Sequence, residues 1–329
     1  MRKVLLFSVF SVLVTVCVAQ QKFNVQNGTK TEFYSSLDSA VYYAAKGDTI
    51  YLPGMYISLN EELVIDKKVT LIGTGWDIDS IGGTQNTIID KDIRFKSGTD
   101  GSLITGCNLQ NINIPEVTAN ITIWRNKING DVILNQAATN IAIMENWING
   151  NKCIIGNEAM NCIIANNVIN GYSYPVTTLK NSVISNNILS SRYDNNFFSN
   201  FNGCIIENNY INGGIYSVTY SYFKNNAFCG AISNFGNNTN TNNLFEQTVE
   251  NTFKTSDWSS HPKYLTIKDN SLCKNAGLDS TDIGIYGGST PFKSGSVPFN
   301  PHINKASIST QTDSNGMLKV NITVSAQNK

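Results

Sequence analysis

A repeat of about twenty residues constrains this chain more than any other feature. Copies that agree in their apolar pattern and in the placing of asparagine begin at Asn120, Asn140, Asn161, Asn181, Gly203 and Tyr220. The equivalent asparagines, spaced by 17 to 22 residues, are Asn126, Asn146, Asn167, Asn187, Asn209, Asn226 and Asn243. A period of this length is typical of a solenoid, in which each repeat packs on its neighbours.

The pattern inside each copy indicates short β-strands. The second, fourth and ninth positions are small or apolar, as in Ile121, Ile123 and Ile128, and Ile and Val favour strands. We expect the repeated asparagine to bend the chain in left-handed backbone, which Asn tolerates, and the Asn-Gly pairs, as at 129–130, to form a second corner. Val132–Leu134 is expected to form a third strand. The chain is therefore predicted to be all-β, a single-stranded parallel β-helix with coils ~4.8 Å apart.

A leucine-rich repeat is the competing solenoid, because its core has a similar period and a similar Ile-x-Ile-x-x-Asn-x-Ile run. Leucine is scarce, the coil length varies and no helical segment separates the copies, so the β-helix is favoured. The asparagines are then predicted to bond to one another from coil to coil. This predicted structural ladder comprises Asn126, Asn146, Asn167, Asn187, Asn209 and Asn226.

The chain begins with the pattern of a cleaved signal peptide. Residues 1–19 have a basic start, an apolar run and a small residue, Ala19, at the end. Cys17 raises the alternative of a lipoprotein leader, to which the bulky Val16 is poorly suited. We therefore expect a secreted, periplasmic or cell-surface protein without a membrane span.

The chain falls into parts that differ in pattern. A helix over 35–45, capped by Ser35 and Asp38, and a strand over 48–52 are predicted to cover the open end of the first coil. Residues 246–270 lose the repeat and are predicted to loop out of the barrel. Two alternating segments around the turn at 313–316 predict a hairpin. The predicted parts are the signal peptide (1–19), an N-terminal cap (20–60), the β-helix (61–290) and a C-terminal linker with a β-hairpin (291–329).

Short segments at both ends of the predicted solenoid carry a resemblance to a known family. Residues 36–41, 47–56 and 69–75 resemble the opening of right-handed parallel β-helix proteins of the pectin-lyase-like superfamily. Residues 275–277 and 282–288 resemble the closing coil of secreted bacterial members. The resemblance implies a right-handed winding and an action on acidic polysaccharide, although a fold by itself does not determine chemistry.

The sequence lacks a clear catalytic pattern for that chemistry. A lyase of this kind needs carboxylates for Ca²⁺ with a basic residue, and a hydrolase needs paired carboxylates. The acidic residues between 103 and 245 do not stack at one repeat position, and the two histidines, His261 and His302, have no motif partner. Catalytic residues thus remain unassigned, no metal site is predicted, and Ca²⁺ is expected only if the chain is a lyase.

Charge and cysteine content exclude other classes. Lys+Arg 24 and Asp+Glu 24 balance, which argues against nucleic acid as a partner. Six cysteines follow the leader, but Cys162 and Cys204 lie two coils apart at ~9–10 Å, beyond the reach of a disulfide. We expect few disulfides or none.

Aromatic residues that the pattern places outward or on loops are the binding candidates, because flat rings suit sugars. The candidate carbohydrate-binding residues are Trp124, Trp147, Tyr172, Tyr174 and Tyr210. In the same register Arg125 and Glu145 are expected to form a surface ion pair, and Lys127 to lie over Trp147.

The sequence is compatible with three functions. The first is an exported, monomeric β-helix protein that binds or organises polysaccharide at the cell surface, without a cofactor. The second is a polysaccharide lyase or glycoside hydrolase. The third is a structural or adhesin-like surface protein. Residues proposed for the enzyme are Asp100, Arg125, Glu145, Lys152 and Lys180.

Overall fold

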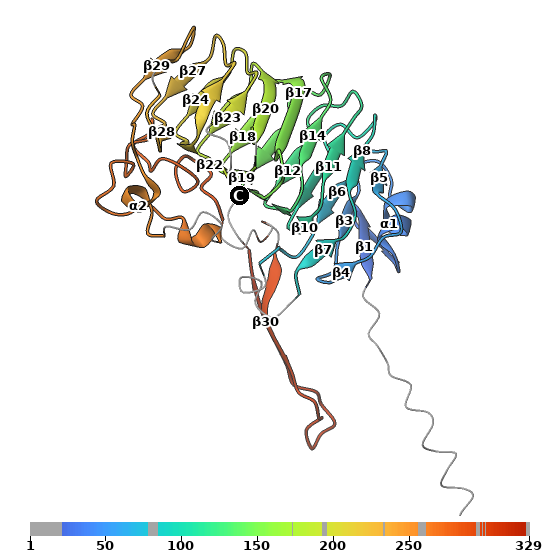
Figure 1. Cartoon of the computed structure of the whole chain (residues 1–329). Helices are drawn as coiled ribbons and strands as arrows, with labels where there is room; N and C mark the ends of the chain where they lie inside the picture. The colour runs from blue at the N-terminus through green and yellow to red at the C-terminus, as the bar shows by residue number, and fades with distance from the viewer. Residues whose placement is uncertain are drawn as a thin grey trace, which may run out of the picture.

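A computed structural model shows three β-sheets arranged around one long core, parallel throughout except where β1 pairs antiparallel at the N-terminal end (Figure 1). It describes residues 22–77, 85–172, 174–192, 196–232, 234–255, 261–293, 297, 299 and 301–326. The predicted signal peptide lies outside the described residues. The chain passes through the sheets in turn, so the predicted parallel β-helix is confirmed.

We call the sheets A, B and C. Sheet A contains, in spatial order, β2 (Lys30–Tyr34), β1 (Phe23–Asn27), β3 (Thr49–Tyr51), β6 (Thr70–Ile72), β9 (Leu103–Thr105), β12 (Thr122–Trp124), β15 (Ala142–Met144), β18 (Ile163–Ala165), β21 (Val183–Ser185), β24 (Ile205–Glu207), β27 (Tyr222–Lys224) and β29 (Thr239–Thr241). Sheet B contains β4 (Tyr56–Ile57), β7 (Thr87–Ile89), β10 (Cys107–Leu109), β13 (Lys127–Ile128), β16 (Trp147–Ile148), β19 (Val168–Gly171), β22 (Ile188–Ser191), β25 (Tyr210–Asn212) and β28 (Ala227–Phe228). Sheet C contains β5 (Leu63–Ile65), β8 (Ile93–Phe95), β11 (Ile112–Ile114), β14 (Val132–Leu134), β17 (Ile154–Met160), β20 (Val176–Lys180), β23 (Asn196–Ser199) and β26 (Gly214–Tyr216).

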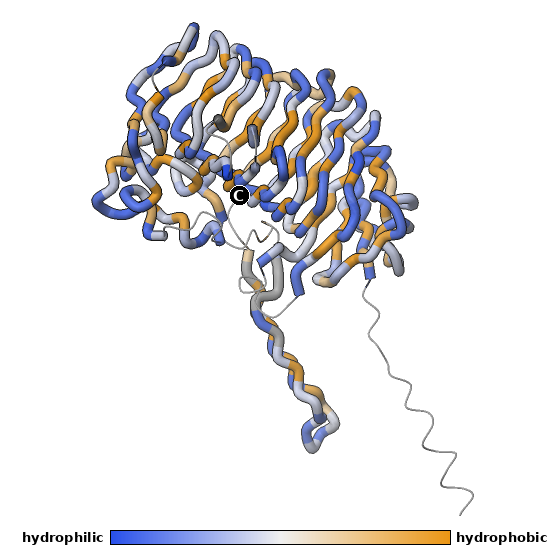
Figure 2. The backbone as a smooth tube through the Cα atoms, in the orientation of Figure 1, coloured by the Kyte–Doolittle hydropathy of each residue, from blue (hydrophilic) through white to orange (hydrophobic). Residues whose placement is uncertain are grey.

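The core is a stack of apolar side chains, one level per coil, as the apolar segments that recur in successive coils indicate (Figure 2). In sheet A the register places Ile123, Ile143 and Ile164 directly over one another, and each is fully buried. Burying one such side chain contributes roughly 1.5–3 kcal/mol. Cys162 and Cys204 also point into this core, and the six described cysteines are free thiols.

The corner between sheets A and B is built from two adjacent rows of residues. The residue before each ladder asparagine has left-handed backbone, with φ of 56° at Arg125 and 51° at Glu145. The prediction that the ladder asparagine itself takes this conformation is thus wrong by one residue. The ladder asparagine has no positive φ, and its side chain bonds to the equivalent asparagine of the next coil, as Asn126 does to Asn146.

The ladder is continuous from Asn126 to Asn243. In each rung one asparagine accepts, at Oδ1, the backbone N–H of its equivalent in the preceding coil at 2.8–3.0 Å and the side-chain amide at 2.9–3.2 Å. Nδ2 also donates to a strand carbonyl, as Asn146 does to Ile123. Each bond contributes a net ~0.5–1.5 kcal/mol, and leaving a buried partner unpaired costs more.

The predicted Asn-Gly corners have a different origin. Gly130 and Gly150 are not left-handed. A Cβ at Gly130 would lie 2.2 Å from Oδ1 of Asn111, and one at Gly150 would lie 2.1 Å from Oδ1 of Asp131. Glycine is required there because the preceding coil approaches closely.

The two ends of the core are closed by different devices. At the N-terminal end helix α1 (Leu37–Tyr43) buries Leu37, Ala40 and Val41. Its N-cap is Ser36, which accepts from the Ser39 N–H, so the predicted cap at Ser35 is wrong by one residue. At the other end Phe223, Phe228, Phe235 and Phe245 pack ring against ring.

The described residues between 246 and 299, which we call the strap, leave the coils and pack along the outer face of sheet B. The strap carries α2 (Val249–Thr252) and the 3₁₀ helix η1 (Pro262–Tyr264). Phe253, Leu265 and Ile283 of the strap pack on the outward row Val168, Ile188 and Tyr210. Residues 246–270 were predicted to loop out of the barrel, and this is correct only for the backbone, because their apolar side chains pack back on it.

The predicted C-terminal hairpin is confirmed. Strands β30 (His302–Ile308) and β31 (Val320–Ser325) pair antiparallel and form a sheet of their own. The turn is fixed by Asp313, whose Oδ1 accepts from the N–H groups of Asn315 and Met317. The hairpin extends away from the solenoid (Figure 1).

Candidate functional site

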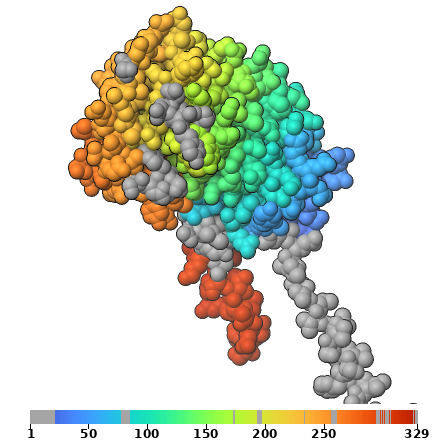
Figure 3. All heavy atoms as spheres, in the orientation of Figure 1, coloured from blue at the N-terminus to red at the C-terminus, as the bar shows by residue number. Residues whose placement is uncertain are grey.

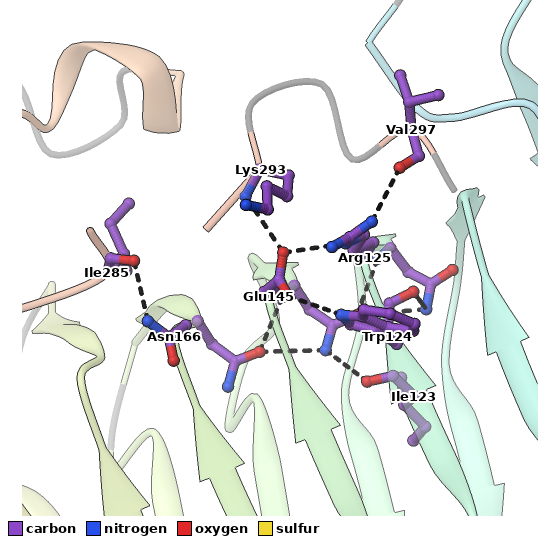
Figure 4. A network of polar contacts seen from close by, with 11 residues as sticks. Ile123, Trp124, Arg125, Glu145, Asn166, Ile285, Lys293 and Val297 are labelled. Atoms are coloured by element: carbon purple, nitrogen blue, oxygen red, sulfur yellow. Dashed lines mark hydrogen bonds and ion pairs between the residues drawn. The ribbon is translucent and has the colours of Figure 1, made fainter. Parts of the chain in front are cut away.

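Arg125 and Glu145 form a buried ion pair beneath the strap (Figure 4). Arg125 Nε donates to Glu145 Oε2 at 2.9 Å, and the two side chains are 0% and 2% exposed. The predicted ion pair is therefore present, but the prediction that it lies on the surface is wrong because the strap covers it. The strap lies outside the repeat pattern from which the pair was predicted. A buried pair of this kind depends on both partners, since either charge alone would be desolvated without compensation.

This network attaches the strap to the coils. Glu145 also accepts from the Trp124 indole at 2.8 Å and from the backbone N–H of Lys293 at 3.2 Å, while Arg125 donates to the Val297 carbonyl at 3.4 Å. Further along the same row, Asn166 Nδ2 donates to the carbonyls of Ile285 and Gly287. The left-handed corner residues therefore serve as anchors for the C-terminal part of the chain.

Trp124, a predicted carbohydrate-binding residue, is held within this network. Its ring lies under the Arg125 guanidinium at 4.3 Å and stacks on Phe299 at 5.5 Å. With its N–H bonded to Glu145 and a face covered, Trp124 is half-buried and packs the strap. Its ring is not presented as a flat outward surface.

Trp147 belongs to a second half-buried cluster. Its ring lies 5.3 Å from Trp76 and 5.6 Å from His261, and Lys127 Nζ lies 4.6 Å from its centroid, as predicted. His261 Nε2 is 3.1 Å from Asp77 Oδ2. The strap thus places an imidazole between two indoles and beside a carboxylate.

Burial alters the proton affinity of this cluster. Desolvation lowers the pKa of His261 below its usual value, against the opposing attraction of Asp77. Desolvation also lowers the pKa of Lys127, again against Asp77. In both cases burial disfavours the charged form of the nitrogen.

Tyr210 is not available as a binding residue. Its side chain is 0% exposed, its ring packs 4.7 Å from Phe253, and its hydroxyl donates to the Gln247 carbonyl at 2.6 Å. The repeat correctly predicts that Tyr210 points out of the barrel. The prediction of a binding role is wrong because the strap covers this face.

Tyr172 and Tyr174 lie at the corner between sheets B and C. Tyr172 is exposed, with the Arg192 guanidinium 4.9 Å from its ring centroid and bonded to its hydroxyl. Tyr174 is half-buried and packs 5.8 Å from Tyr216. The structure therefore separates this pair from Trp124 and Trp147, which lie under the strap.

Of the residues proposed for an enzyme, Arg125 and Glu145 meet in the buried ion pair, but Asp100 and Lys152 lie at other corners. Asp100 lies between β8 and β9, Glu145 between β15 and β16, and Lys152 between β16 and β17, which are three different corners of the coil. Asp100 accepts a backbone N–H from Ala119, and Lys180 pairs with Glu158. Within the described ranges no group of three or more His, Cys, Asp or Glu side chains is arranged to hold a metal ion. In the same part of the chain no helix has both the length and the apolar character to cross a membrane.

A cleft at the N-terminal cap is the site that the structure adds. It encloses about 460 Å³ between the β1–β2 hairpin and the end of α1. The hairpin contributes Asn27, Thr29, Lys30 and Glu32, and the segment after the helix contributes Asp48. Asp48 is buried and accepts the Ala45 N–H at 2.8 Å, which fixes its carboxylate at the cleft.

One wall of the cleft is aromatic. Tyr43 lines it and stays 65% exposed, stacked on Tyr34 at 5.6 Å with 10° between the ring planes. Tyr42 meets Tyr43 edge to face at 4.9 Å. The Tyr34 hydroxyl donates to Glu32 at 2.6 Å, and this bond raises the pKa of Tyr34 to about 12. The stack is therefore tied to the carboxylate of the cleft.

No family model, curated protein or solved structure matches this chain. The candidate site therefore rests on its own geometry.

The sequence contains a signal for this cleft that the repeat-based interpretation did not use. Tyr42 and Tyr43 fall outside the apolar stripe of the predicted helix, so they were bound to face solvent. What the sequence does not predict is the approach of Tyr34 and Glu32, because β2 pairs antiparallel with β1 outside the repeat.

Proposed function

We propose that this protein binds carbohydrate, and that the cleft at the N-terminal cap is its binding site. The observation that carries the proposal is an exposed, stacked tyrosine forming one wall of a cleft whose other walls hold fixed polar groups. Aromatic rings pack on the C–H faces of sugars, and a few placed polar groups provide orientation. The proposed residues are Tyr43 as the stacking face, and Asn27, Glu32 and Asp48 as partners for hydroxyl groups.

The charges of the cleft favour a neutral sugar. Glu32 and Asp48 are both at the cleft, against the single cation Lys30. Carboxylates accept hydrogen bonds from sugar hydroxyls, whereas a uronic acid would bring a like charge to them. We therefore infer a neutral glycan as the ligand, in place of the acidic polymer that the family resemblance implies.

The setting of this function is part of the same proposal. The signal-peptide pattern supports export, and the resemblance to the pectin-lyase-like superfamily supports a right-handed winding and a role at the cell surface. Binding at one end of a rigid solenoid would leave its sides free for other contacts.

Isothermal titration of the purified chain with neutral and uronic oligosaccharides tests the proposal. Tyr43→Ala is expected to weaken binding of the neutral ligand by about tenfold or more, which corresponds to ~1.4 kcal/mol. Tyr220→Ala is the matched control, since Tyr220 is 67% exposed and lies near the opposite end of sheet A. Equal loss in both variants, or no binding of any saccharide, contradicts the proposal.

Catalysis on polysaccharide is the second candidate, and the His261, Asp77 and Lys127 cluster is the observation that favours it. Product release is measured as reducing ends, and as absorbance near 232 nm for unsaturated uronates. Activity that His261→Gln removes would support this candidate. Absence of product with every polymer would exclude it for those substrates.

A further inference from the structure

Within the described part of the chain, the C-terminal hairpin has an apolar face that stays about half exposed. Val320, Ile322 and Val324 alternate along β31 and therefore share one face, and Ile308 lies opposite Val320 across the pair. These four side chains are 48%, 53%, 55% and 60% exposed, respectively. The hairpin projects beyond the body of the molecule (Figure 3).

An isolated two-stranded ribbon with such a face is marginally stable in water. Its hydrogen-bonded strands and its fixed turn provide order, but the apolar face gains nothing until another surface covers it. Contiguous exposed apolar groups of this kind mark interaction sites. A flat, apolar partner surface would remove this face from water.

Sheet A of the same chain carries a surface of that kind. The register aligns Ile163, Val183, Ile205 and Tyr222 in one row across four neighbouring strands. The residue that follows each of them is buried, so the row points outward. Ile163, Ile205 and Tyr222 are 45%, 36% and 48% exposed. We call this row the ridge.

The hairpin face and the ridge match in length. From Val320 to Val324 is four residues, or ~14 Å at ~3.4 Å per residue. From Ile163 to Tyr222 is three steps between strands, or ~14 Å at ~4.8 Å per step. Each surface thus presents four side chains, mostly aliphatic, over the same span.

We propose that the hairpin of one molecule docks on the ridge of a second copy, with its strands running along the solenoid axis. The hairpin points away from its own body, and every other copy offers a ridge of matching length. Two molecules that exchange hairpins bury two equivalent contacts and form a closed, symmetric dimer. This replaces the sequence-based expectation of a monomer.

Sedimentation velocity of the purified chain over a wide concentration range tests the proposal. The wild-type chain is expected to shift from monomer to dimer, and Ile322→Asp or Ile205→Asp to weaken the dimer about 30-fold or more, as loss of a central interface residue does. Thr323→Asp, on the other face of the hairpin, and Thr70→Asp, four strands before Ile163 in the same outward row, are the matched controls and should leave association unchanged.

Mixing the two interface variants gives a second, independent test. Ile205→Asp retains an intact hairpin and Ile322→Asp retains an intact ridge, so their equimolar mixture is expected to form a mixed dimer that neither forms alone. A wild-type chain that stays monomeric at every concentration overturns the proposal. So does association that survives Ile205→Asp, or a mixture that remains monomeric while circular dichroism shows both variants folded.

Discussion

Asn146 accepts two hydrogen bonds from Asn126, one from its backbone N–H at 2.9 Å and one from its side-chain amide at 3.2 Å. Both residues are fully buried, so water cannot replace either bond. The same side chain donates to the Ile123 carbonyl at 2.8 Å. Asn146 Nδ2 also donates to Asn167 Oδ1 in the following coil at 3.1 Å, so this one asparagine joins three successive coils at the corner between sheets A and B.

Asn146→Ala is expected to lower the free energy of unfolding by about 2–5 kcal/mol, because it takes the Oδ1 acceptor from the buried Asn126 N–H and removes the side-chain bond to the Ile123 carbonyl. Urea unfolding followed by circular dichroism measures the loss. Asn129→Ala is the control, since Asn129 is exposed and its loss should cost about 0.5 kcal/mol. Similar losses in the two variants would show that the ladder does not stabilise the fold.

Arg125→Met is expected to destabilise the protein by ~3–5 kcal/mol, because Glu145 would remain buried as an unpaired charge. The double variant Arg125→Met/Glu145→Gln should recover part of this loss, since the amide carries no charge. Limited proteolysis is predicted to cut the strap first in the single variant. Lys180→Met, at the exposed pair with Glu158, should change stability by less than ~1 kcal/mol. A strap that resists proteolysis equally in all variants would contradict the anchoring role.

Acidification is expected to destabilise the packing of the strap through His261. Its pKa is lowered in the folded protein relative to the ordinary 6.5, so the unfolded chain binds the proton more readily. The contribution of His261 to the free energy of unfolding is therefore fully present above pH 6.5. It declines as the pH falls from there through the lowered pKa of the folded protein. Thermal unfolding between pH 5 and 8 measures this, and His261→Gln should flatten the dependence in that window. An unchanged profile in the variant would assign the effect to other groups.

Native alkylation is expected to modify Cys229 before any other described cysteine. Cys229 is half-buried, whereas Cys107, Cys153, Cys162, Cys204 and Cys273 are buried. Burial raises the pKa of Cys107 and Cys153 to about 12, so these thiols are both inaccessible and protonated. Peptide mass spectrometry after iodoacetamide treatment measures the order in which the cysteines are alkylated, and a urea-unfolded sample is the control. Early labelling of Cys107 would contradict the inward orientation of its strand.

The architecture was predictable because it follows from local repetition. Ile123, Ile143 and Ile164 recur at one position, and a repeated apolar position in strands of one register has to face a common core. The ladder followed from the same reasoning, since buried amides at equal spacing find partners in each other. The left-handed position was missed by one residue, because Arg125 and Glu145 carry no compositional sign of that backbone.

The surroundings of the candidate residues were not predictable for a different reason. Tyr210 and Trp147 point out of the barrel as expected, but contacts with Phe253 and His261 decide their exposure. Those contacts join residues far apart in the chain, and the strap has no repeat from which to infer its path. The cleft at Tyr43 depends likewise on one antiparallel hairpin outside the pattern.

The ladder also determines how this molecule can change in size. Each ladder asparagine bonds to the asparagines of the coils immediately before and after it. An insertion shorter than one coil would interrupt the ladder, whereas an insertion of one complete coil would extend it. Duplicating a segment such as 127–146 should therefore yield a longer particle of the same cross-section, in which added length and added stability rise together.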